Sequence, residues 1–149
     1  GPFTLKPVND FTLLEQEGLD VSVAKPVLIP GKVHIVKGTL RGPGEDEVTR
    51  LVLNCGGLYV IQELELLERS PLLNQEKLPL DENPEFSDLL SERRTHSDGM
   101  GDLLRWWTFD EDSAIISTHS VLVPAHKGVS ATGSKWILNG VSGVLHQNF

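Results

Sequence analysis

The chain has 149 residues, of which 39% are hydrophobic and 23% charged, a composition typical of a folded protein rather than a disordered one. Its formal net charge is −8 at pH 7 and no basic run stands out, so neither a nucleic acid nor an anionic membrane is the expected partner. The single cysteine excludes an internal disulfide, and we expect a cytoplasmic protein without a membrane-spanning segment. The length predicts one domain over residues 3–149, and Gly1-Pro2 has the sequence expected of the scar of a cleaved expression tag.

Alternating β-branched residues predict strands in the first third of the chain. The segments between the early prolines, residues 11–16 and 19–25, are long enough only for short strands. We expect Pro30-Gly31 to form a turn that begins a strand over residues 32–41, where β-branched residues alternate. An acidic loop and the run VTRLVLN then complete a hairpin.

The middle of the chain is less regular and contains the one expected helix. Residues 58–69 fit a helix or a strand, and we predict a strand because apolar residues alternate over most of the segment. Asn83-Pro84 is a helix start, with Asn as the N-cap and Pro at the first helical position. Apolar residues follow at helical spacing, so we predict a short amphipathic helix over residues 84–93.

The segment Leu103–Val123 contains two runs of β-forming residues on either side of the polar tetrad DEDS. We predict a hairpin whose tip is this tetrad, residues 110–113, and whose side chains alternate between two faces. One face carries Arg105, Trp107, Phe109, Ala114, Ile116, Thr118 and Ser120, and the other carries Leu104, Trp106, Ile115, His119 and Val121. Both faces contain large apolar residues, so we expect an outward Trp106 to be covered by the helix or by a second copy of the chain.

The end of the chain predicts a last strand over residues 136–149, in which Gly140 and Gly143 allow a sharp bend, while Pro124 is expected to end the strand before it. The run Ala131–Trp136, followed by these glycines, resembles the late Thr-Gly, aromatic and Gly-x-x-Gly strand of small antiparallel barrels such as the allene oxide cyclase and dirigent proteins. The resemblance is confined to this segment and does not assign the family. It implies a barrel with an apolar interior, often oligomeric, that binds a hydrophobic molecule or guides its cyclisation without a cofactor.

These elements predict a mostly β fold, an antiparallel β-barrel or strongly bent sheet of about seven or eight strands with one short helix. Aromatic and polar side chains on the same strands are typical of the lining of a small-molecule pocket. The candidate ligand-binding residues are Tyr59, Arg105, Trp107, Thr118, His119 and Trp136. Core packing is the competing interpretation for each aromatic residue.

Two patterns suggest other chemistry. Two histidines and a carboxylate can form the facial triad that binds non-haem iron. The candidate residues are His96, Asp98 and His146. We prefer the interpretation that His96 lies in a solvated loop before an Asp-Gly turn and that no metal binds. Cys55, His119 and Asp110 could be a nucleophile, a base and an acid, but the predicted hairpin separates the last two, and Cys55 is better interpreted as a buried structural residue.

The function that we predict is that of a small cofactor-independent barrel that encloses an apolar small molecule, as a binding protein or as an isomerase or cyclase. A non-catalytic protein–protein interaction domain of a larger protein is the first alternative, supported by the acidic composition and the doubly apolar hairpin. A fragment of a non-haem iron oxygenase is the second. We expect a homodimer in which the predicted hairpin meets its own copy, because such an interface needs only one self-complementary patch.

Overall fold

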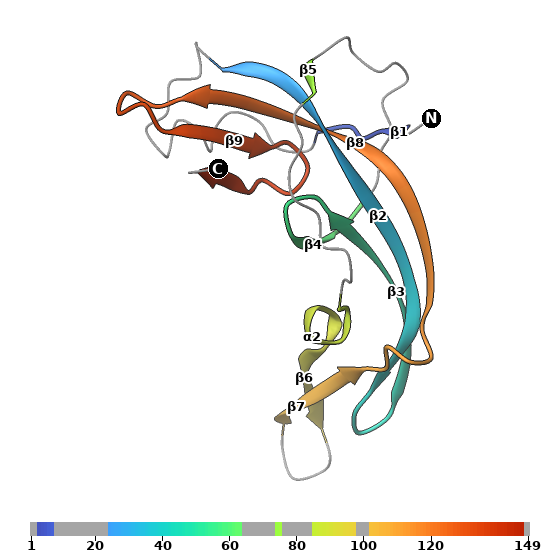
Figure 1. Cartoon of the computed structure of the whole chain (residues 1–149). Coiled ribbons are helices and arrows are strands. Elements are labelled where there is room, and N and C mark those ends of the chain that lie inside the picture. Colours follow the sequence, from blue (N-terminus) through green and yellow to red (C-terminus); the bar gives the residue numbers. More distant parts are fainter. Residues whose placement is uncertain (1–2, 8–23, 64–73, 76–84, 98–101, 148–149) are drawn as a thin grey trace.

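The computed structural model describes residues 3–7, 24–63, 74–75, 85–97 and 102–147, which form an open, strongly curled sheet with the shape of a half-barrel (Figure 1). The prediction of a mostly β, strongly bent sheet with one short helix is confirmed. The strands are β1 (Phe3–Thr4), β2 (Lys25–Arg41), β3 (Glu45–Asn54), β4 (Leu58–Ile61), β5 (Asn74–Gln75), β6 (Glu92–Ser97), β7 (Asp102–Phe109), β8 (Ile115–Val129), β9 (Lys135–Asn139) and β10 (Leu145–Gln147), and the helix is α2 (Ser87–Leu90). No helix in the described part of the chain is long and apolar enough to cross a membrane.

The sheet is organised around β2, a strand of 17 residues. Its main path has the order β10-β9-β8-β2-β3-β4. The predicted hairpin with β3 is confirmed and stays in register from the pair Lys32–Asn54 to the pair Arg41–Glu45. On the other edge of β2, β8 pairs antiparallel along most of its length. Strands this long accumulate the right-handed twist of a sheet, and the sheet therefore curls.

The turn predicted at Pro30-Gly31 is wrong, because both residues lie inside β2. Pro30 is opposite Leu122 of β8, whose carbonyl points away from β2 and accepts a hydrogen bond from the Leu5 amide at 2.9 Å. Pro30 and Leu122 therefore form a pair that exchanges no hydrogen bonds. The missing N–H of Pro30 points to the side where β3 has already ended, so the proline costs the sheet nothing.

Pro124 does not end its strand either, and the prediction that it does is wrong. It lies inside β8 opposite Leu28, and its carbonyl accepts a hydrogen bond from the Gly140 amide at 2.8 Å. The position of its missing N–H, like its carbonyl, points to the edge of β8 away from β2, so the pairing with β2 is unaffected.

β7 and β8 do not form the predicted hairpin, because they do not pair with each other. Both lie on the same edge of β2, where the pair Lys37–Ile115 ends the pairing with β8 and the pair Leu40–Phe109 begins the pairing with β7. Between these two pairs β2 advances three residues while the other chain segment advances six. β7 and β8 thus follow one another along the same edge of β2. The polar tetrad between them is a bulge rather than a hairpin tip.

The predicted division of side chains between two faces nevertheless holds. Phe109 and Ile116 lie opposite Leu40 and Val36, which share one face of β2. We call this the inner face and the opposite one the outer face. The outer face carries Trp106, since side chains alternate along β7. The bulge adds an odd number of residues to the segment that pairs with β2. The side chains before and after it therefore fall on the same two faces that a four-residue hairpin tip would give them.

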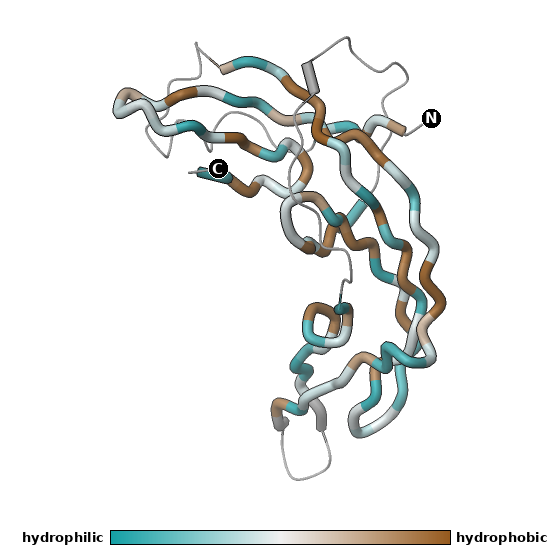
Figure 2. The backbone as a smooth tube through the Cα atoms, viewed as in Figure 1, coloured by the Kyte–Doolittle hydropathy of each residue, from teal (hydrophilic) through white to brown (hydrophobic). Residues whose placement is uncertain are grey.

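Two clusters of buried residues stabilise the sheet, and they lie on opposite faces of β2. The odd-numbered residues of β2 contribute to the upper cluster and its even-numbered residues to the lower one. Figure 2 shows hydrophobic residues along both halves of β2. The upper cluster contains Leu5, Val27, Ile29, Val33, Leu53, Cys55, Val121, Val123, Ala125, Ile137 and Val141, and the lower one contains Val36, Leu40, Val48, Val52, Phe86, Leu90 and Phe109.

The helix is confirmed but is shorter than the predicted range 84–93. It spans Ser87–Leu90, and the last two residues of the predicted range, Glu92 and Arg93, lie in β6 instead. Leu90 packs into the lower cluster on the inner face, together with Phe109. The helix therefore does not cover Trp106, whose side chain is 55% exposed on the outer face.

The remaining predictions concern the chain ends and the middle. β4 confirms a strand for the first part of residues 58–69, whereas residues 64–69, Asn83-Pro84 and nearly all of the two N-terminal candidate strands lie outside the described residues. The predicted last strand is two strands, β9 and β10, with the expected bend between them. At this bend Gly143 has a φ of 73°, a conformation that favours glycine.

Candidate functional site

The part of β8 from Ile115 to Ser120 is an open edge of the sheet. β2 pairs with these residues on one side. On the other side β1 occupies Val121 and Leu122, and β9 begins at Ala125, but no described residue pairs with Ile115–Ser120. We call this segment the open edge.

The backbone groups that point outward from the open edge can be identified from its occupied neighbours. On the edge of β8 away from β2, the carbonyl of Leu122 accepts a hydrogen bond from the amide of Leu5, just after β1, and the carbonyl of Pro124 accepts one from the amide of Gly140, just after β9. Backbone groups of an antiparallel strand alternate sides from one residue to the next, so the even-numbered residues point outward throughout. The outward row of the open edge consists of Ile116, Thr118 and Ser120. Each offers one N–H donor and one carbonyl acceptor without a partner in the described structure.

The side chains of the open edge are exposed and uncharged. Ile115 is 72% exposed and Ile116 is 42% exposed, and only Ser, Thr and His residues follow them up to Ser120. Natural sheets usually protect a free edge with charged side chains, proline, a bulge or a covering element. Between Ile115 and Ser120 the described structure shows none of these. Nothing in the described part of the open edge therefore prevents another strand from pairing with it.

His34 supports the open edge from β2. Its Nδ1 lies 2.9 Å from Oγ1 of Thr118, and its ring meets Phe86 edge to face at a centroid distance of 5.4 Å. Burial, with a smaller contribution from Lys32, lowers the pKa of His34, so the imidazole is neutral at pH 7. A neutral ring nitrogen and a hydroxyl share one hydrogen bond, which fixes the side chain of the central residue of the row.

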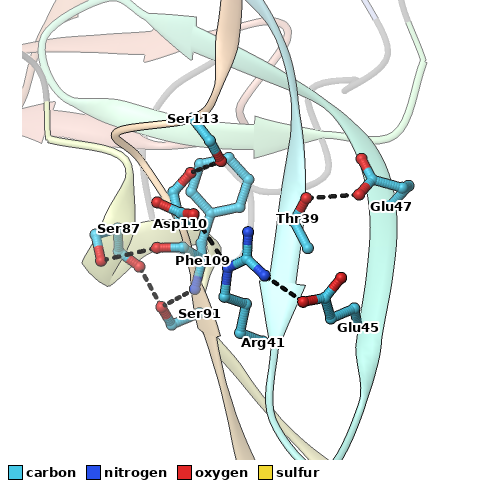
Figure 3. A network of polar contacts seen from close by, with 9 residues as sticks. All are labelled: Thr39, Arg41, Glu45, Glu47, Ser87, Ser91, Phe109, Asp110 and Ser113. Atoms are coloured by element: carbon cyan, nitrogen blue, oxygen red, sulfur yellow. Dashed lines mark hydrogen bonds and ion pairs between the residues drawn. The ribbon is translucent and has the colours of Figure 1, made fainter.

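The polar tetrad closes the lower end of the open edge. The carboxylate of Glu111 accepts hydrogen bonds from the amides of Phe86 and Ser87 at 3.0 and 3.3 Å, at the N-terminus of α2. Figure 3 shows Asp110 beside Arg41, with 3.1 Å between its carboxylate and Nε of the arginine. Hydrogen bonds from Ser113 and from Arg41 lower the pKa of Asp110. These contacts of Glu111 and Asp110 stabilise the bulge against α2 and β2.

We expect Glu111→Ala to lower the free energy of unfolding by about 0.5–2 kcal/mol, because two amides at the start of α2 lose their acceptor. Urea denaturation followed by tryptophan fluorescence measures the change. Asp112→Ala is the matched control, since this neighbouring carboxylate is exposed and should change stability by less than about 0.5 kcal/mol. Equal stabilities of the two variants would contradict the capping role.

We also expect stability to fall as the pH falls below about 6.5, the ordinary histidine pKa. Burial lowers the pKa of His34, His126 and His146 in the folded protein. The unfolded chain therefore binds protons first, and stability that is present above pH 6.5 is lost as the pH falls through the lowered values. Urea midpoints at about pH 7.5 and 5.5 test this. His34→Gln should reduce the difference, and identical wild-type midpoints would contradict the prediction.

The structure does not bring the predicted ligand-binding residues together. Tyr59 lies in β4, where its hydroxyl donates a hydrogen bond to the carbonyl of Gly56 at 3.3 Å. Trp136 is buried in β9. Arg105 and Trp107 lie in β7. Trp107 is half-buried, and Cζ of Arg94 lies 5.0 Å from the centroid of its ring. The remaining two, Thr118 and His119, lie on the open edge. Their role in ligand binding stays a prediction.

Two adjoining hollows lie beside β4 and α2, with volumes of about 550 and 700 Å³. They share the lining residues Val60, Ile61, Gln62 and Leu89. An ion pair between Arg50 and Glu92, at 3.7 Å, lies at the wall of the larger one. Of the predicted ligand-binding residues, Tyr59 lines the smaller of these two, and Trp136 lines a separate hollow of about 240 Å³.

The predicted metal candidates are on different parts of the sheet. His96 lies in β6, so the loop that we expected around it is wrong. His146 lies in β10, and Figure 1 shows these two strands at opposite ends of the molecule. Asp98 lies outside the described residues. Among the residues that are described, no group of three or more His, Cys, Asp or Glu side chains could hold a metal ion.

Cys55 is a buried structural residue, as predicted. It belongs to the upper cluster, and burial raises the pKa of its thiol to about 12. A thiol with a raised pKa stays protonated at neutral pH, which argues against the nucleophile considered from the sequence.

Comparisons with protein-family models, with curated proteins and with solved structures find no match to this chain. The open edge is therefore identified from its geometry alone. The sequence contains one signal for it, the uncharged run IISTHS, which the predicted hairpin would have paired with β7.

Proposed function

We propose that the chain is a non-catalytic binding domain that takes a strand from another polypeptide onto the open edge of β8. The observation that carries this proposal is the outward row of Ile116, Thr118 and Ser120, whose backbone groups lack partners in the described structure. In strand addition, main-chain hydrogen bonds supply affinity and the alternate side chains supply specificity. A cytoplasmic location, in keeping with the free buried thiol of Cys55, is part of the proposal.

The open edge defines what the incoming strand should look like. β1 at Val121 and the bulge before Ile115 limit the paired segment to a short strand. Its residues opposite Ile115 and Ile116 meet exposed apolar side chains, and those opposite Thr118 and Ser120 meet hydroxyl groups. Cross-strand pairs favour like chemistry, so the partner strand should be apolar at one end and polar at the other.

The outer face next to the open edge also supports an interaction function. Leu104 and Trp106 of β7 are 68% and 55% exposed, on the same face as Ile115. Monomeric proteins seldom leave several large apolar side chains exposed along one face. These residues offer a partner further apolar surface on the outer face.

A matched pair of variants tests strand addition. Ser120→Pro removes one outward N–H and leaves the pairing with β2 intact, as Pro124 already does in the same row. Ser120→Ala keeps that N–H. In a selection of randomised ten-residue peptides displayed on phage, we expect peptides that bind wild type and Ser120→Ala and bind Ser120→Pro at least about tenfold more weakly. A wild-type selection without enriched peptides, or peptides that bind all three proteins equally, would refute the proposal.

The hollows beside β4 support a second candidate function, the binding of an apolar small molecule for transport, isomerisation or cyclisation. Their volumes lie within the range of ligand pockets, and Val60, Ile61 and Leu89 supply apolar lining. A native mass spectrum of freshly purified protein should then contain a retained ligand. Leu89→Trp should abolish its retention, while Val129→Trp, an exposed position on β8, should not. Wild-type protein without any retained ligand would contradict this candidate.

A further inference from the structure

We infer that the strand added to the open edge is acidic at its upper end, with an aspartate or glutamate opposite Ser120 whose carboxylate pairs with Lys32 of β2. The inference rests on the proposed function, because it names the chemistry of the partner at the same edge.

Lys32 is an unpaired cation beside the open edge. It is exposed on β2 and lies between Asn54 of β3 and Ser120 of β8, neither of which is charged. It forms no ion pair with any described residue. Three basic residues of the neighbouring strands, by contrast, each pair with a carboxylate, namely Arg41, Arg50 and Arg94. The chain therefore leaves a positive charge beside the open edge, although its acidic residues outnumber its basic ones by 21 to 13.

The position of Ser120 lets Lys32 reach an added strand. Their side chains are on the same face, because the two residues are direct neighbours across the pair of β2 and β8. A residue added opposite Ser120 would continue this row, with its Cα two strand spacings, or about 10 Å, from that of Lys32. The serine side chain between them is short. An extended lysine and an acidic side chain can therefore meet across it, and opposite charges in such a cross-strand row attract.

The limits of the open edge set where the acidic residue lies in the added strand. Phe3 of β1 occupies the position opposite Val121, so the position opposite Ser120 is the last one that an added strand can fill. The other end of the added strand meets the exposed side chains of Ile115 and Ile116. The partner is therefore a short strand with an acidic residue at its upper end and apolar residues at its lower end.

Lys37 has the corresponding place at the lower end but is less able to contact the partner. It lies opposite Ile115, whose branched side chain lies between Lys37 and an added strand. The adjoining polar tetrad carries three carboxylates, which reduce the local positive charge. Salt screens charges that are more than about 10 Å apart, so the nearest groups decide which end of the strand is acidic. We therefore expect Lys32, rather than Lys37, to bind the carboxylate.

Peptides from the phage selection on wild type test this inference. We expect them to carry an aspartate or glutamate at one fixed end of the paired segment. They should bind Lys32→Glu at least about fivefold more weakly, because like charges replace an exposed ion pair. Lys37→Glu is the matched control with the same change of net charge, and it should weaken binding by less than about twofold. Fluorescence anisotropy of labelled peptides measures the affinities, and circular dichroism checks that both variants are folded.

A charge exchange identifies the contact itself. A peptide whose acidic residue is replaced by lysine should bind Lys32→Glu more tightly than it binds wild type. Enriched peptides without an acidic residue, or equal losses in the two lysine variants, would overturn the inference. If such peptides still bind Ser120→Pro more weakly than Ser120→Ala, strand addition stands and only the acidic partner is wrong. A selection without enriched peptides refutes the proposed function and the inference together.

Discussion

Trp136→Ala is expected to lower the free energy of unfolding by about 3–5 kcal/mol. The side chain is 1% exposed, and a methyl group added at Gly128 would lie 2.4 Å from its Cζ2, so the indole covers the backbone of β8 directly. Its indole N–H has no hydrogen-bond partner in the described structure, and the loss is therefore one of packing alone. Urea denaturation, with fluorescence from the remaining tryptophans, measures the change.

Trp106→Ala is the matched control for that experiment. This variant also removes an indole, but from an exposed position, where Cζ of Arg93 lies 5.8 Å from the centroid of the Trp106 ring. An exposed cation–π contact contributes about 0.5–1 kcal/mol, so the expected loss is several times smaller. If the two variants were equally destabilised, the placement of Trp136 in the core would be wrong.

Gly38→Ala is expected to cost about 1–3 kcal/mol, although alanine is otherwise well tolerated in extended backbone. The added Cβ would lie 2.6 Å from Cζ of Phe109, a ring that is fully packed in the lower cluster. Gly44→Ala is the control, because its Cβ would meet only Trp107, at an ordinary 3.8 Å.

A double-mutant cycle identifies the cause of that loss. Phe109→Leu shortens the side chain that the new methyl group would meet, so Gly38→Ala should cost less in this background than in wild type. Thermal or urea denaturation of the four proteins gives the coupling energy. Additive losses would show that Gly38 matters for a reason other than this contact.

Local patterns were sufficient for much of the fold. Alternation identified the part of β2 from Lys32 to Arg41 and its hairpin with β3, and it assigned the side chains around Trp106 and Trp107 to the correct faces. The same reasoning failed at Pro30 and Pro124, because a proline is tolerated in a strand when its nitrogen points away from the strand that it pairs with and no ladder hydrogen bond needs its N–H. Which side has a partner is decided by strands distant in the sequence.

The polar tetrad shows the same limit more sharply. A short polar run between two β-forming runs fits a hairpin tip and a bulge equally well, and only the pairing of both runs with β2 distinguishes them. The open edge could not be predicted for this reason. The sequence predicted a strand for these residues and a pocket for Thr118 and His119. An open edge, however, is defined by the absence of a neighbouring strand rather than by a motif.

The position of the two cores on opposite faces of β2 divides the molecule energetically. Among the described residues, no buried residue belongs to both clusters, and β2 and β3 each contribute residues to both of them. Cooperative folding units often coincide with such separately packed regions. We therefore expect local opening of the lower half, with α2 and the bulge, to leave the upper core buried, and we expect β2, which contributes to both clusters, to couple the stabilities of the two halves.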